Sequence, residues 1–124
     1  MALVMDQTTK SKALILAACP RLNKGVALYE HTWINHIKPF KHRVTERHFD
    51  LIKQIIENTD ESQAIWYKRD NSKKMCIVKQ VPHFQPRDKF ILIALNVYSD
   101  KVACITSIYP VDELPSKEKG YNLL

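Results

Sequence analysis

Four runs rich in β-branched and aromatic residues follow one another in the C-terminal half, and they constrain the fold most. They cover residues 63–69, 73–81, 89–98 and 101–111. Short polar links between such runs are typical of antiparallel strands joined in chain order. The sequence therefore predicts a four-stranded antiparallel meander. Its third run contains "FILIAL" (90–95), which lacks polar alternation and is predicted to be the central strand, covered on both faces.

One amphipathic helix is predicted in the N-terminal half, over residues 44–58. Thr45 is a plausible N-cap, and apolar residues follow at helical spacing: Phe49, Ile52 and Ile56. The apolar segment 12–19 ends at Pro20 and fits either a buried strand or a short helix. We therefore expect an α+β fold, with an N-terminal helical region packed on the four-stranded antiparallel sheet.

The length of 124 residues suits a single domain. We expect residues 1–124 to form that domain, with a core over 12–111 and a polar, peripheral tail over 112–124. Two glycines are too few for a glycine-rich phosphate loop, so no nucleotide cofactor is expected.

Three absences in the sequence bear on the cellular compartment. The N-terminus lacks the long apolar core of a signal peptide, and no apolar run approaches the roughly 18–20 residues that span a bilayer. The three cysteines lie in apolar runs without a CxxC pair, as expected of free thiols in a reducing compartment. These features predict a cytoplasmic protein with no membrane partner.

The formal net charge of +6 favours an anionic partner such as nucleic acid or an acidic protein. Seven Lys and Arg residues against two Asp residues lie between Lys68 and Lys89, a local charge of +5. A second basic run extends from Lys38 to Arg47. Both runs equally fit a solvated surface.

Three of the five histidines, His31, His36 and His42, lie within residues 30–44. Their spacings of five and six differ from the four-residue helical step that places two imidazoles on one face, and HExxH is absent. No metal site is therefore predicted. Nucleophilic thiol catalysis is also disfavoured, because apolar surroundings raise the pKa of a thiol.

Proton transfer by histidine fits the remaining pattern. Metal-independent RNA cleavage needs a base, an acid, and donors for the phosphorane oxygens. We predict a catalytic set of four residues: His36, His42, Lys68 and Thr106. Strand alternation would place Thr106 on the opposite face from Tyr109, so the two should not share one cleft.

Six further residues are predicted to contact RNA: Lys38, Lys41, Arg43, Tyr67, Lys79 and Tyr109. The alternative for the tyrosines is a purely structural role as amphipathic sheet residues. The alternative for the histidines is a half-buried or surface position without function, and Trp33 is expected to pack in the core.

Residues 27–69 resemble a pattern, W-x-x-H-I followed by H-P and N-P-D, found in phage- and polymorphic-toxin-associated members of the barnase–EndoU–colicin–RelE ribonuclease superfamily. The first part is carried by Trp33, His36, Ile37 and His42, and "ENTDES" (57–62) stands in place of N-P-D. The later strand runs extend the resemblance to residues 26–111. Two motif prolines are replaced, by Arg43 and Thr59.

The resemblance implies a compact α+β fold and RNA cleavage without metal or cofactor. It also implies a toxin, with RNA (tRNA among the candidates) as substrate and an antitoxin or immunity protein as partner. Members vary their catalytic residues, so activity does not follow from fold. The alternatives are a non-catalytic basic module that binds nucleic acid or protein, and a partner protein of a larger phage or defence system.

Overall fold

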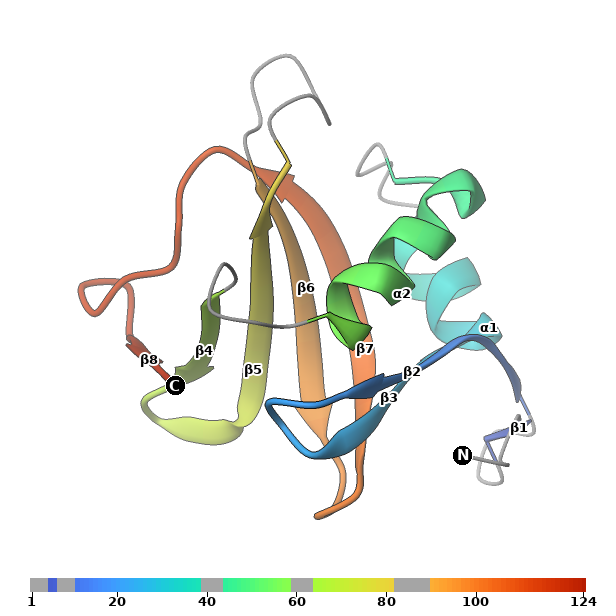
Figure 1. Cartoon of the computed structure of the whole chain (residues 1–124), viewed down its shortest axis with the longest axis horizontal. Helices are drawn as coiled ribbons and strands as arrows, with labels where there is room; N and C mark the ends of the chain where they lie inside the picture. The colour runs from blue at the N-terminus through green and yellow to red at the C-terminus, as the bar shows by residue number, and fades with distance from the viewer. Residues whose placement is uncertain (1–4, 7–10, 39–43, 59–63, 82–89) are drawn as a thin grey trace.

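The computed structural model describes residues 5–6, 11–38, 44–58, 64–81 and 90–124. The strands are β1 (Met5–Asp6), β2 (Ser11–Cys19), β3 (Lys24–Tyr29), β4 (Ala64–Lys68), β5 (Asn71–Gln80), β6 (Phe90–Val97), β7 (Val102–Val111) and β8 (Tyr121–Leu123). The helical segments are α1 (Glu30–Thr32), the π-helix η1 (Trp33–Ile37), the 3-10 helix η3 (Glu46–His48) and α2 (Phe49–Glu57). Figure 1 shows the helices gathered on one side of a curved sheet.

The strands form a mixed sheet in the order β1-β2-β3-β7-β6-β5-β4-β8. The meander predicted from the four runs is present as β4 to β7, with each strand antiparallel to the next. The sheet continues on the other side of β7, where β3 pairs with it in parallel. None of the described helices has the length and apolar character that a membrane crossing needs.

The predicted fold class was wrong. A four-stranded antiparallel sheet under an N-terminal helical region does not describe this chain, because its N-terminal part supplies strands β1 to β3 to the same sheet. The ambiguous apolar segment 12–19 belongs to β2. It forms a hairpin with β3 through a turn in which the Asn23 N–H donates to the Pro20 carbonyl at 3.2 Å. Asn23 adopts φ of 53°, a left-handed conformation that asparagine tolerates well.

The helix predicted over 44–58 is present as η3 followed directly by α2. At its start, the Thr45 backbone N–H donates to His48 Nδ1 at 2.9 Å, which satisfies a backbone donor at the helix start. Three isoleucines of α2, Ile52, Ile55 and Ile56, are buried. This apolar face packs on β2, as the prediction of an amphipathic helix requires.

One face of the sheet forms the core with these helices. Ile93 of β6 pairs with Ile77 on one side and Ile108 on the other, and all three are fully buried. Directly paired residues of antiparallel strands point to the same face, so this row is the floor of the core. Trp33 and Ile37 of η1 belong to the same cluster.

The central strand β6 is not covered on both faces, and that part of the prediction was wrong. Ile91, Ile93 and Leu95 are buried, whereas Leu92 and Ala94 between them are only partly buried. Because side chains alternate along a strand, Leu92 and Ala94 point away from the core. The sheet side to which they point is called the pocket face below.

Trp33 holds the helical segments together, as expected of a core residue. Its ring meets Phe49 edge-on, with 4.9 Å between centroids, and it is 3% exposed. Its Nε1 donates to Glu46 Oε1 at 3.2 Å. Lys38 Nζ lies 3.8 Å from the same oxygen, so η1 and η3 meet at one exposed carboxylate.

The pKa of Glu46 lies below its ordinary value of 4.5. Its carboxylate accepts a hydrogen bond from its own backbone N–H and another from the Trp33 side chain, and the positive charge of Lys38 lowers the pKa further. Because the pKa of Glu46 is lower in the folded state than in the unfolded state, its ionised carboxylate stabilises the fold at pH values above the unfolded-state pKa. The contribution is lost as pH falls through the folded value.

We expect wild type to melt at a higher temperature than Glu46→Gln at pH 7, and the gap to close at acid pH. The amide removes the charge but keeps an acceptor for Trp33. Thermal unfolding of both proteins from pH 7 to pH 3 checks this. A gap that stays constant across this range would contradict the assigned role of Glu46.

Candidate functional site

A pocket of about 370 Å³ opens on the pocket face of the meander. It is lined by Lys68, Lys74, Met75, Cys76, Leu92, Ala94, Leu95, Asn96, Thr106, Tyr109 and Tyr121. These residues come from β4, β5, β6, β7 and β8. The volume falls within the range of roughly 300–1,000 Å³ that is typical of small-ligand sites.

The sheet register explains why these side chains meet. Leu92 pairs with Tyr109, Ala94 lies between Cys76 and Ser107, and Asn96 pairs with Lys74. Paired residues share a face, so an apolar floor of leucine and alanine is bordered by polar and aromatic side chains. The segment "FILIAL" (90–95) lacks polar alternation because its residues on the second face, Leu92 and Ala94, form the apolar floor of the pocket.

Thr106 reaches the pocket because the pairing of β7 with β6 is irregular. Ala94 pairs with Ser107 and the next residue, Leu95, pairs with Ile105, so Thr106 is an extra residue. A bulge of this kind changes the direction of a side chain relative to simple alternation. Thr106 Oγ1 donates to the Ala94 carbonyl at 3.4 Å, and Thr106 lines the same pocket as Tyr109. The expectation that these two residues could not share a cleft was therefore wrong.

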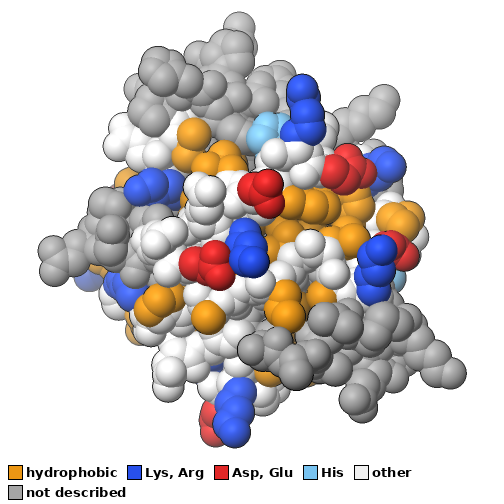
Figure 2. All heavy atoms as spheres, turned by 45° about the vertical axis from the view of Figure 1, so that its right-hand side comes forward, with side chains coloured by type: hydrophobic (Ala, Val, Ile, Leu, Met, Phe, Trp, Pro, Cys, Tyr) orange, Lys and Arg blue, Asp and Glu red, His pale blue; other side chains and the backbone are white. Residues whose placement is uncertain are grey.

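The pocket lining is positively charged. Lys68 is half-buried and Lys74 is exposed, and the lining contains no Asp or Glu among the described residues. The described helical segments differ, since they carry four acidic residues (Glu30, Glu46, Asp50, Glu57) and two Lys or Arg residues (Arg47, Lys53), with Lys38 directly after η1. Figure 2, which brings the helical side forward, shows both signs interspersed there.

Cys76 is also among the lining residues, and it is buried. Burial raises the pKa of the Cys76 thiol to about 11. The thiol is therefore protonated near pH 7 and is a poor nucleophile, in line with the low reactivity predicted from its apolar surroundings.

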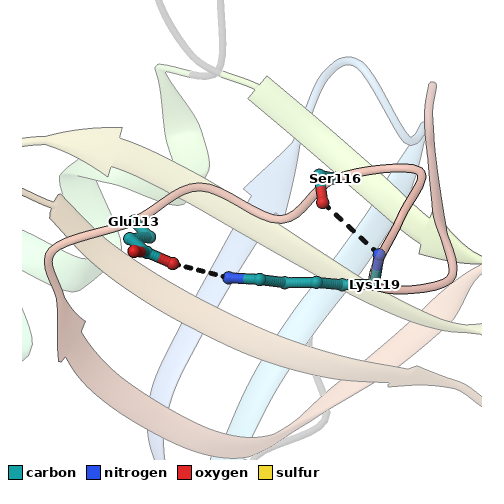
Figure 3. A network of polar contacts seen from close by, with 3 residues as sticks. All are labelled: Glu113, Ser116 and Lys119. Carbon is teal, nitrogen blue, oxygen red and sulfur yellow. Dashed lines mark hydrogen bonds and ion pairs between the residues drawn. The ribbon is translucent and has the colours of Figure 1, made fainter.

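Tyr121 is brought to the pocket by the connection between β7 and β8. This connection is braced by an ion pair of 2.8 Å between Lys119 Nζ and Glu113 Oε2, and the Lys119 backbone N–H donates to Ser116 Oγ at 3.4 Å (Figure 3). Arg69 adds a side-chain donation to the Lys117 carbonyl at 2.6 Å. Tyr121 then pairs with Lys68 at the edge of the meander.

The structure brings three of the predicted site residues together: Lys68, Thr106 and Tyr109 all line the pocket. Two predicted RNA-contacting residues lie elsewhere on the same strands. Tyr67 pairs with Met75, and Lys79 pairs with Ile91, a core residue. By alternation Tyr67 and Lys79 point to the face opposite Lys68 and Leu92.

His36 does not join the pocket residues. It is exposed on η1, whose Trp33 and Ile37 pack in the core on the other side of the sheet. Lys38, which directly follows η1, forms an ion pair with Glu46. The predicted residues His42, Lys41 and Arg43 lie outside the described residues.

Sequence reasoning missed three polar or aromatic residues of the pocket: Lys74, Asn96 and Tyr121. Lys74 belongs to the basic run that was singled out, but its face could not be assigned without the register. Asn96 stands out as a polar residue within the apolar third run. Tyr121 carries no local signal, because only the pairing of β8 with β4 brings it near.

Among the described residues, no three His, Cys, Asp or Glu side chains are grouped so that they could hold a metal ion. Comparisons with protein-family models, with curated proteins and with solved structures gave no match to this chain. The resemblance to the ribonuclease superfamily thus rests on the motif residues alone.

The placement of His36 across the sheet from Lys68 leads to a prediction about RNA cleavage. Any cleavage of labelled RNA in EDTA should proceed at the same rate in wild type and in His36→Ala. Removing a general acid or base usually costs about 10²–10⁴-fold, so a loss of this size in His36→Ala would contradict the prediction.

Proposed function

We propose that this protein binds single-stranded RNA on the pocket face as a non-catalytic module. The observation that carries the proposal is the meeting of two lysines and two tyrosines around an apolar floor, with no carboxylate among the described lining residues. Lysines bind phosphates, and aromatic rings stack on unpaired bases. The pocket offers both kinds of contact within one site.

The concave form of the site favours single strands over duplexes. A base enters a pocket only when it is unpaired and turned out of the stack, and sequence-specific RNA recognition mostly targets such bases. Tyr109 and Tyr121 are half-buried, so their rings combine an anchored position with an accessible surface. Stacking on such rings contributes about 1–3 kcal/mol per base.

The electrostatics of the pocket support the same ligand. Lys68 is half-buried, and neither of the two ion pairs between described residues, Lys38–Glu46 and Lys119–Glu113, includes it. A partly buried cation is less screened by salt than a fully exposed one. An RNA phosphate would supply an opposite charge to Lys68, with Lys74 as a second cation at the same site.

A metal-independent endoribonuclease is the second candidate. Its support is that Lys68, Thr106 and Tyr109, each predicted to face RNA, line one pocket. Such an enzyme would place donors around the phosphate at this site, without His36. A toxin with an antitoxin or immunity protein remains a prediction of the family resemblance.

Binding of a fluorescein-labelled single-stranded RNA, measured by anisotropy at several salt concentrations, tests the proposal. Lys68→Gln and Lys74→Gln should each weaken binding and reduce the slope of log affinity against log salt by about 0.7. The matched control is Lys53→Gln, which removes one exposed charge from α2 on the helical side.

The control should bind like wild type. Equal losses in all three variants would show that binding depends on net charge alone, and the pocket would then have no special role. Absence of RNA binding by wild type at low salt would overturn the proposed function altogether.

A further inference from the structure

We propose that the RNA strand extends beyond the pocket along β6 and stacks a second unpaired base on the ring of Tyr98. This inference rests on the proposed function and adds a second contact site on the same face of the sheet. Tyr98 directly follows β6 and is 71% exposed. No other tyrosine, tryptophan or phenylalanine among the described residues is exposed. Its ring is thus the most accessible aromatic surface in the described part of the chain.

The pairing of β6 with β7 places the Tyr98 side chain on the pocket face. Val97 pairs with Ala103, which is fully buried, and Val97 itself packs against the core. The Tyr98 N–H donates to the Val102 carbonyl at 2.9 Å, so the pairing continues one residue past the end of β6. Because side chains alternate along an extended strand, Tyr98 points away from the core, to the same side as Asn96.

Asn96 lies between the pocket floor and Tyr98 on β6. It lines the pocket, and Tyr98 follows two residues later, a rise of about 6–7 Å along a strand. An RNA strand with one base on the apolar floor at Ala94 can therefore pass over Asn96 and reach Tyr98. Sheet surfaces that bind single-stranded RNA stack two or three bases on aromatic rings in this way. Every base has a face that can stack, so this second contact requires no particular base.

The charges along this path suit the phosphates that join the two bases. Lys74 lines the pocket at one end of the path. At the other end, Lys101 is exposed in the turn that follows Tyr98. Lys24 Nζ lies at the same turn, where it donates to the Asp100 carbonyl at 2.9 Å. Two lysines against Asp100 give this end a positive charge, which favours an RNA backbone.

The test compares a ligand that fills the pocket alone with one long enough to reach both sites. Uridine monophosphate is the short ligand, followed by NMR shifts of the ¹⁵N-labelled chain, and fluorescein-labelled U8 is the long one, followed by anisotropy. Wild type and Tyr98→Ala should bind uridine monophosphate alike. Tyr98→Ala should bind U8 at least about fivefold more weakly than wild type, the lower end of what stacking of one base provides. Tyr98→Phe should bind U8 like wild type, because stacking needs the ring and not the hydroxyl.

The matched control is Ile34→Ala, which removes a side chain that is 50% exposed on η1, at the helical side, and should bind U8 like wild type. Equal binding of U8 by wild type and Tyr98→Ala, with binding still weakened by Lys68→Gln, would overturn the second contact and leave the proposed function standing. A loss in Tyr98→Phe or Ile34→Ala as large as that in Tyr98→Ala would also overturn stacking on this ring. Weaker binding of uridine monophosphate by Tyr98→Ala would contradict a site separate from the pocket. No binding of U8 by wild type would overturn both proposals.

Discussion

The parallel pairing of β3 with β7 is the contact on which the architecture depends. Gly25, Val26 and Ala27 lie beside Val102, Ala103 and Cys104, which joins the N-terminal hairpin to the meander in one sheet. The hairpin widens the sheet, and α2 packs on its β2. The helical layer therefore sits on one face, where Trp33 and the isoleucines of α2 close the core.

Placing the helices on one face leaves the opposite face of the meander for the pocket. On β6 the same strand serves both purposes, since Ile93 belongs to the core and Leu92 to the pocket floor. The irregular pairing at Thr106 adds a hydroxyl to the pocket that regular alternation would direct away. Lysines on β4 and β5 then make the rim basic. The proposed recognition of RNA thus uses the sheet surface, with apolar contact for a base and charge for phosphate.

Local patterns predicted the parts of this fold that depend on local contacts. The meander was predicted because its strands are neighbours in sequence and are separated by turn-like links. The amphipathic helix was predicted from the spacing of residues such as Ile52 and Ile56. The segment containing Ile15 could not be assigned, because a short apolar run fits a strand or a helix equally well. The segment is a strand because the hairpin turn at Asn23 pairs it with β3, and β3 in turn pairs with β7, which is distant in sequence.

The candidate site was predictable to a similar extent. Lys68, Thr106 and Tyr109 were singled out from residue chemistry, and the structure places them at one pocket. His36 was predicted as a catalytic residue from its place in a histidine-rich segment. The sequence does not show which face of the sheet that segment covers, and the structure places it on the face opposite the pocket. Tyr121 could not be found, since the pairing of β8 with Lys68 joins distant parts of the chain.

Mapping the RNA-binding surface by NMR tests the central claim most directly. Unlabelled single-stranded RNA would be titrated into the ¹⁵N-labelled chain, and the amide shifts followed residue by residue. The account predicts the largest changes on the pocket strands, around Lys74, Asn96 and Thr106. Changes confined to η1 and α2 would place the RNA on the helical face and contradict it.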